Sequence, residues 1–185
     1  MYLNNMYNLT EPNVNRIVDY TLTELGYGEP ITIDMAKLYC RVSTGTIEDG
    51  LFAIFITAAR MAIEKFSGIS LVPKTATVFI YNYCGYFKIP FGPVVSSIAI
   101  TDEYGGSVDA VITGDMFPEI KQAMSGLVKL EYSCGYGEIP AELKIAILDQ
   151  INFMYENRGD TSDAIPLCQK AQLIAQKYYQ HSFFE

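Results

Sequence analysis

The spacing of hydrophobic positions predicts helices near both ends of the chain and strands between them. Apolar residues recur every three to four positions, as on one face of a helix, over residues 33–42, 47–67, 140–157 and 163–180. Residues 74–133 instead contain short runs rich in Val, Ile, Thr and Tyr, separated by turn residues, which is typical of strands. The pattern predicts an α+β fold over residues 31–185. We expect a mainly helical domain, with a long central helix, C-terminal helices and an inserted block of short antiparallel strands and hairpins.

The first 30 residues are predicted to form an arm that contains a helix. Thr10 can cap this helix and Pro12 fits its first turn, and its apolar face would consist of Val14, Ile17, Val18, Thr21 and Leu25. Gly26 and Gly28 then end it. The pattern leaves open whether the arm embraces a neighbouring protein, packs on its own domain or is disordered.

The predicted helix over 47–67 is apolar on nearly all sides. One face carries Leu51, Ile54, Phe55, Ala58 and Ala62, and the opposite face carries Phe52, Ile56, Ala59 and Ile63. Such a helix must be covered on both sides. We predict a subunit interface on the second face, unless neighbouring elements of the same subunit cover it. Thr46, with Asp49 three residues later, resembles a capping box at the start of this helix.

The composition is typical of a protein that buries part of its surface against partners. The 185 residues include 13 Lys and Arg against 21 Asp and Glu, which gives a net charge of −8, and only 18% of the chain is charged. The absence of a Lys and Arg cluster argues against a protein that grips nucleic acid, but not against one that lets nucleic acid slide past. Solubility alone explains the acidity equally well. No apolar run approaches the ~20 residues that span a bilayer, and no signal peptide is recognised.

Reactive groups are sparse, and we predict no catalytic, cofactor-binding or metal-binding site and no enzymatic activity. The one histidine, His181, is the fifth residue from the C-terminal end of the sequence. The cysteines lie far apart in the sequence and include no C-x-x-C pair. This spacing favours reduced thiols, rather than disulfides or a zinc site, at Cys40, Cys84, Cys134 and Cys168. Gly135-Tyr136-Gly137 precedes a predicted helix but lacks the spacing of a phosphate-binding loop, so a turn is expected there.

Four stretches, in order and spacing, resemble the head–tail connector family of tailed bacteriophages, whose members are adaptor or head-completion proteins below the portal. The stretches are Ile31-Thr32-Ile33-Asp34-Met35-Ala36-Lys37; Glu48-Asp49-Gly50-Leu51 with its continuation to Gly68; Pro93-Val94-Val95-Ser96-Ser97-Ile98 with its continuation to Gly105; and Val128-Lys129-Leu130-Glu131-Tyr132-Ser133-Cys134-Gly135-Tyr136-Gly137-Glu138-Ile139-Pro140 with its continuation to Arg158. The resemblance extends from Ile31 to about Tyr178, and the first 30 residues depart from the family's pattern.

The resemblance implies a structural virion protein of the head–tail neck, made in the cytoplasm of a bacterial host. Its partners would be further copies of itself in a ring, commonly a dodecamer, the portal protein, and a downstream neck or tail protein. Double-stranded DNA would pass through the ring without specific binding, and no membrane is involved. The alternatives are another neck or tail-completion component of the stopper type, or, from a different class, a small-ligand-binding or enzymatic domain.

Two sets of exposed positions are expected to serve these contacts. Residues 102–107 have the composition of a hairpin tip, and there we expect a contact with the channel or the next ring at Asp102, Glu103 and Tyr104. Termini in the family tend to contact neighbouring components, which implies portal docking through Tyr178, Tyr179, Phe183 and Phe184. The alternative for these rings is that they close the subunit's own core.

Overall fold

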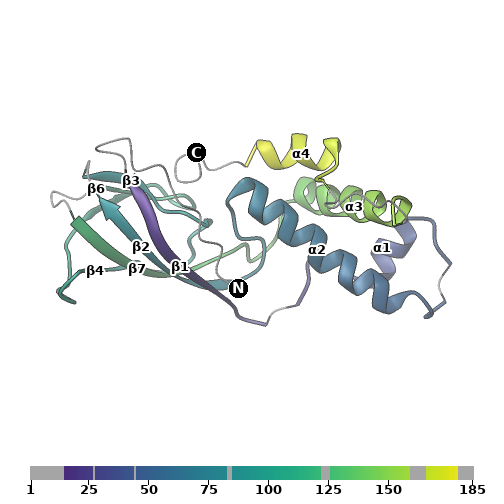
Figure 1. Cartoon of the computed structure of the whole chain (residues 1–185), viewed down its shortest axis with the longest axis horizontal. Helices are drawn as coiled ribbons and strands as arrows, with labels where there is room; N and C mark the ends of the chain where they lie inside the picture. Colours follow the sequence, from purple (N-terminus) through teal and green to yellow (C-terminus); the bar gives the residue numbers. More distant parts are fainter. Residues whose placement is uncertain are drawn as a thin grey trace.

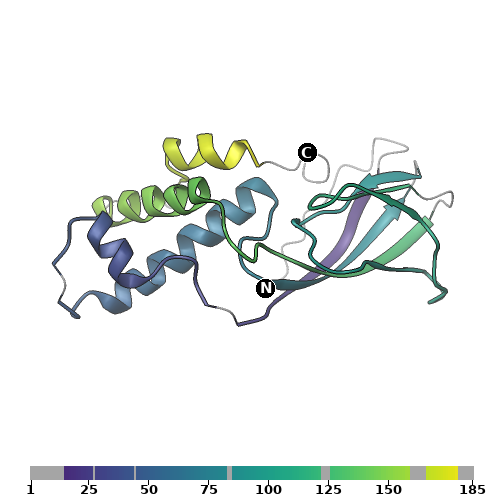
Figure 2. The ribbon, with the colours of Figure 1, turned by 180° about the vertical axis from the view of Figure 1, so that it is seen from behind.

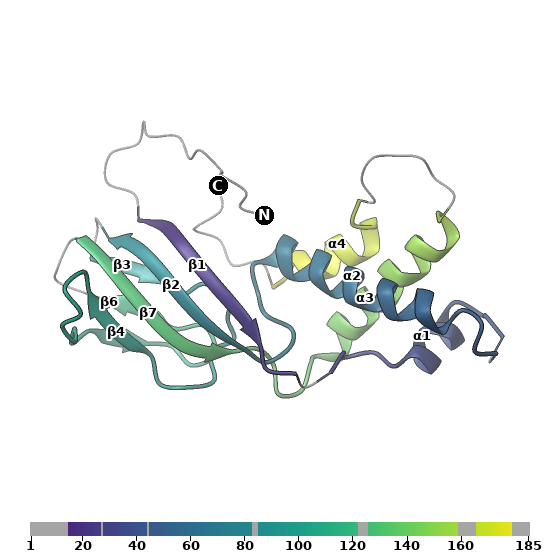
Figure 3. The same ribbon diagram turned by 60° about the horizontal axis from the view of Figure 1, so that its bottom comes forward.

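A helical half and a sheet half lie end to end in an elongated molecule (Figures 1 and 2). The computed structural model describes residues 15–26, 28–43, 45–82, 85–121, 126–158 and 166–178. Each half has its own cluster of buried apolar side chains, one among the helices and one among the strands. The chain passes between the halves where α2 leads into β2, where β7 leads into α3, and where β1 leads toward α1 (Figure 3).

The helical half contains α1 (Ile33–Tyr39), α2 (Asp49–Ser67), α3 (Ala141–Glu156) and α4 (Gln169–Gln176). The helices predicted over 33–42, 47–67 and 140–157 are confirmed, with ends that differ by a few residues. Thr32 caps α1, since its hydroxyl accepts a hydrogen bond from the Met35 amide at 3.2 Å. Gly68 ends α2 in the left-handed conformation, at φ 71°, where glycine has no Cβ penalty.

The predicted capping box at the start of α2 is wrong. Glu48 is the N-cap residue and makes no side-chain capping bond. The Asp49 carboxylate instead pairs with the ammonium group of Lys37 on α1, which also donates to the Gly45 carbonyl at 2.6 Å. Lys37 is 3% exposed, and a buried cation requires a carboxylate partner, so Asp49 serves the contact between α1 and α2.

The predicted helix over 163–180 is shorter in the structure, because residues 166–168 are not helical. Gln150 of α3, which is buried, donates to the Pro166 carbonyl at 3.2 Å and accepts from the Cys168 amide at 2.7 Å. These two bonds hold the incoming chain in an extended conformation. The helix therefore begins only after Cys168, its N-cap residue.

The strands form two antiparallel sheets. The four-stranded sheet has the order β1-β2-β7-β4, with bounds Arg16–Glu24, Lys74–Asn82, Gly126–Cys134 and Ala99–Asp102. The three-stranded sheet has the order β3-β6-β5, with bounds Tyr86–Lys88, Glu119–Lys121 and Val111–Thr113. The predicted α+β class and the strand block are confirmed. The domain is not mainly helical, since 34% of the described residues are in helices and 28% are in strands.

The helix predicted in the N-terminal arm is wrong for the described residues, because Arg16–Glu24 forms strand β1. This strand lies along one edge of the four-stranded sheet and pairs with β2, with Leu22 opposite Ala76 and a bulge between Ile17 and Asp19 (Figure 3). β-Branched and aromatic side chains favour a strand, and pairing satisfies the backbone groups of β2. Thr10, Pro12 and Val14 lie outside the described residues.

Gly135, at the end of β7, occupies a position that requires glycine. Its φ is 110°, and a Cβ there would lie 2.3 Å from the Val72 carbonyl oxygen. The close approach joins the end of β7 to the segment that leads into β2. Gly137, by contrast, has open space around it. The motif Gly135-Tyr136-Gly137 is thus explained by backbone packing in a turn, as its spacing predicts.

Candidate functional site

The predicted subunit interface on α2 lies in the chain's own core. Phe52, Ile56, Ala59 and Ile63 are at most 2% exposed. They belong to the buried cluster of the helical half, together with Leu143, Ile147 and Ala171 of α3 and α4. The Phe52 ring also stacks on Tyr155 of α3, with 5.3 Å between ring centroids. These four side chains cannot meet a second copy, and the prediction is corrected: neighbouring helices of the same subunit cover this face.

The opposite side of α2 keeps apolar side chains at the surface. Ile54 is 66% exposed and Met61 56% exposed, while Leu51 and Ala58 are half-buried. Phe55, which the sequence pattern placed on this face, turns into the core. The helix therefore has one sealed face and one face that remains available for contacts.

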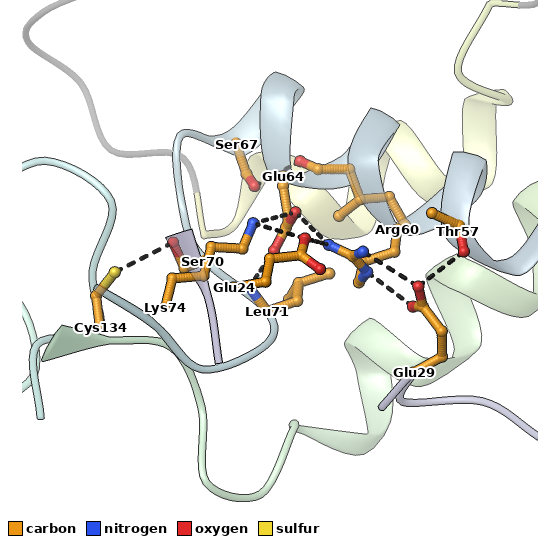
Figure 4. Close-up of polar contacts among 11 residues, drawn as sticks. Glu24, Glu29, Thr57, Arg60, Glu64, Ser67, Ser70, Leu71, Lys74 and Cys134 are labelled. Carbon is orange, nitrogen blue, oxygen red and sulfur yellow. Dashed lines mark hydrogen bonds and ion pairs between the residues drawn. The ribbon is translucent and has the colours of Figure 1, made fainter. Parts of the chain in front are cut away.

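A cluster of charged side chains that the sequence pattern did not predict lies where the two halves meet. The Arg60 guanidinium of α2 contacts three carboxylates, of Glu24 at the end of β1, of Glu29 in the following linker and of Glu64 one turn along α2 (Figure 4). The distances from the guanidinium nitrogens to the carboxylate oxygens are 2.9, 2.7 and 2.9 Å. Lys74 of β2 contacts Glu64 at 2.8 Å and Glu24 at 3.7 Å.

The carboxylates of this cluster receive further hydrogen bonds from groups with no charge. One Glu64 oxygen accepts from the Leu71 amide at 2.7 Å, and one Glu29 oxygen accepts from the Thr57 hydroxyl at 2.8 Å (Figure 4). Burial opposes the ionisation of Glu29, but the hydrogen bonds from Arg60 and Thr57 outweigh it and lower the pKa of this carboxyl group. Glu29 is thus held in its charged form.

Burial likewise opposes the charge on Arg60, but the hydrogen bond to Glu29 and the surrounding carboxylates raise the pKa of its guanidinium. Arg60, Glu64 and Lys74 are all buried, at 2%, 8% and 6% exposure. The cluster therefore fastens β1, the linker and β2 to α2, and fixes the sheet half against the helical half. The pair Arg60 and Glu64, four residues apart on an otherwise apolar helix, was the available sequence signal.

The predicted contact at Asp102, Glu103 and Tyr104 lies on a hairpin tip, as expected. The Asp102 carboxylate accepts hydrogen bonds from the amides of Tyr104 and Gly106 at 2.9 and 2.7 Å, so it shapes the turn. Tyr104 is 87% exposed. A hydrogen bond to Glu103 and the charge of that carboxylate raise the pKa of the Tyr104 hydroxyl. Glu103 and Tyr104 are therefore the two groups of the tip that are presented outward.

The predicted portal-docking set falls largely outside the described residues. Tyr179, Phe183 and Phe184 lie outside them, as does His181. Tyr178, two residues after the end of α4, is half-buried and packs against the core of the helical half. Burial raises the pKa of Tyr136 to about 12, and the nearby Tyr178 adds to this effect.

The described residues offer little reactive chemistry. Within these ranges, no group of three or more His, Cys, Asp or Glu side chains is arranged to hold a metal ion. Cys40, Cys134 and Cys168 are free thiols, and burial raises the pKa of Cys40 to about 11 and raises that of Cys134. The thiolate forms of Cys40 and Cys134 are therefore scarce near neutral pH. Among the described helices, none is long and apolar enough to cross a membrane.

No protein-family model matches the chain, and no curated protein matches it. Solved structures that contain chains of similar fold include three of gene transfer agent (GTA) particles. In the neck of an empty GTA particle, computed with C6 symmetry, one chain is 19% identical with a TM-score of 0.64. Chains in the virion of the native particle and in its neck, computed with C12 symmetry, are each 18% identical, with TM-scores of 0.63 and 0.58.

In all three comparisons the similarity extends over 89% of this chain and 97% of the other. The match therefore includes both the helical half and the sheet half. The resemblance to a neck component, which the four sequence stretches indicated, is confirmed in the fold: this chain folds like a chain from the neck of gene transfer agent particles.

Proposed function

We propose that this chain is a structural neck protein of a virion, a ring adaptor that docks below the portal, extends the DNA channel and joins capsid to tail. The observation that carries the proposal is the fold match to chains of GTA necks, which covers nearly the whole of both chains. The C6 and C12 symmetries of those necks favour several copies of one chain around an axis, twelve in the simplest arrangement.

Properties of the chain itself support the same role. Large apolar side chains remain exposed on α2, as a subunit that contacts neighbours requires. The net charge of −8 suits a channel wall, because like charge prevents the counterion release that holds DNA on a basic protein. DNA would then pass without specific binding. The charged cluster at Arg60 keeps the two halves in one orientation, which a closed ring of identical subunits demands.

Electron microscopy of necks released from particles tests this function. We expect the full-length chain, located with an antibody or a small tag, in a ring of identical copies next to the portal. A position farther from the portal would identify a stopper or tail-completion component instead. Absence of the chain from particles, or its presence only as single copies, would contradict the proposal.

The hairpin tip provides a test of the proposed channel contact. Charge reversal by Glu103→Lys should leave the melting temperature unchanged, because this side chain takes no part in the turn's hydrogen bonds with the Asp102 carboxylate. A lysine that faces passing DNA would attract phosphates, so retention or ejection of DNA, or the joining of the tail, should change.

Asp102→Ala is the matched control at this tip. It removes the two hydrogen bonds to the amides of Tyr104 and Gly106 and should lower stability by about 1–3 kcal/mol, without placing a positive charge there. If particles that carry Glu103→Lys eject DNA and join tails at wild-type rates, a channel or next-ring contact at this position is excluded.

A further inference from the structure

The exposed side of α2 carries a regular apolar seam. The residues in this outer seam recur at alternating intervals of three and four positions: Leu51, Ile54, Ala58 and Met61, with Lys65 at its end. An average interval of 3.5 residues is the repeat by which helices pack side by side through interlocking side chains. Ile54 and Met61 are mostly exposed, and Leu51 and Ala58 flank them half-buried. In Figure 3, α2 lies in front of α3 and α4, so the side away from these helices faces the reader.

The outer seam is free of carboxylates, although the chain as a whole is strongly acidic. The acidic residues of α2 are Asp49, which pairs with Lys37, and Glu64, which is buried against Arg60 and Lys74. Two copies with a charge of −8 each repel one another, so a contact between copies is favoured where carboxylates are missing. A basic partner, in contrast, would find no opposite charge on the seam. Among the neighbours in the proposed ring, this charge pattern therefore favours another copy of this chain as the occupant.

A ring contact is heterologous, so the seam must meet a different surface of the next copy. The far side of the helical half offers one. Ile145 of α3 and Leu173 of α4 are 47% and 59% exposed, and each lies between residues of its helix that pack inward toward α2. These two side chains thus remain exposed on the helices that cover the sealed face of α2.

We propose that the outer seam of α2 in one copy packs against the α3 and α4 face around Ile145 and Leu173 in a second copy. The proposal rests on the ring function proposed above and gives that ring its principal contact. It replaces the contact through Phe52, Ile56, Ala59 and Ile63, which the core of the subunit occupies.

Photo-cross-linking of the full-length chain locates the contact. A benzophenone side chain at position 54, in the assembled ring or in particles, should produce dimers of this chain, and peptide mapping should find the link within residues 141–176. Capture of a different protein, of another region of the second copy, or of nothing while the ring is present would overturn the proposal.

Charge substitutions measure the same contact by assembly. Ile54→Glu and Met61→Glu should weaken association of copies at least tenfold in sedimentation or mass photometry, with the melting temperature of the monomer unchanged because both side chains are exposed. Val111→Glu on β5 is the matched control, since Val111 is 62% exposed and lies in the sheet half. It should change association less than twofold.

The outcomes separate the two proposals. If the two seam variants assemble like the wild type, or if Val111→Glu weakens association equally, the seam contact is overturned. The proposed ring function is not affected by either result. Failure of the wild-type chain to form a ring, alone or in particles, would overturn the proposed function and the seam contact together.

Discussion

Replacing Arg60 with Met is expected to lower the free energy of unfolding by about 3 kcal/mol, which corresponds to a loss of roughly 6–12 °C in melting temperature for a chain of this size. Met keeps the volume of the aliphatic stem, so the loss reports on charge rather than on a cavity. Glu64 would remain buried with only Lys74 opposite it, and Glu29 would lose its principal partner. The loss of stability lies at the lower end of the range for breaking a buried ion pair, because the carboxylates of Glu24 and Glu29 can still reach solvent.

Thermal and urea unfolding of the full-length chain measure this effect. Lys177→Met is the matched control, since Lys177 pairs with Glu142 at 3.2 Å on the surface, where both side chains are more than half exposed. An exposed pair of this kind contributes at most about 1 kcal/mol. Similar losses for Arg60→Met and Lys177→Met would show that the cluster does not stabilise the junction between the two halves.

Phe52→Ala should destabilise the isolated subunit by about 3–5 kcal/mol, the largest effect that we expect from a single side chain in this protein. Phe52 is fully buried, stacks on Tyr155 and packs in the cluster of the helical half. Its removal would leave a cavity that the surrounding helices fill only in part. Chemical unfolding of the variant at a concentration where the protein is monomeric measures the loss.

Ile54→Ala, two residues farther along α2, serves as the comparison. Its side chain is 66% exposed, so truncation should change monomer stability by less than about 0.5 kcal/mol. Equal stability of the Phe52→Ala and wild-type monomers, with a defect only in the assembled ring, would restore the interface that the sequence pattern predicted on the buried face.

The helices could be predicted because their signals are local. Thr32 and Gly68 mark the start of α1 and the end of α2, and the apolar spacing of α2 and α3 is regular over four or more turns. The strands β2 and β7 are similarly recognisable from their composition. The N-terminal strand was not, because the positions of Val14, Ile17, Val18 and Thr21 fit a helix while their side chains favour a strand. The free edge of β2, distant in sequence, decides between the two.

The candidate site likewise combines features that local sequence predicts with features that depend on distant residues. The sequence identifies α2 as a helix with two apolar faces and the tip at Asp102 as a hairpin, since both depend on neighbouring residues only. It could not reveal which face is sealed, because that depends on how α3 and α4, some 80 to 120 positions later, pack on the helix. The sequence places only Glu64 near Arg60, four residues later, and only the fold brings Glu24, Glu29 and Lys74 to this cluster.

The sequence by itself determined the α+β class, most helix positions, the acidic surface and the resemblance to a neck protein. The first three follow from composition or from residues a few positions apart, and the resemblance follows from four stretches in their order and spacing. The tertiary structure alone decided the strand at the N-terminal end, the charged junction between the halves and the face of α2 that stays open. The physical reason is that backbone pairing, ion pairing and burial depend on groups that only the folded chain brings into contact.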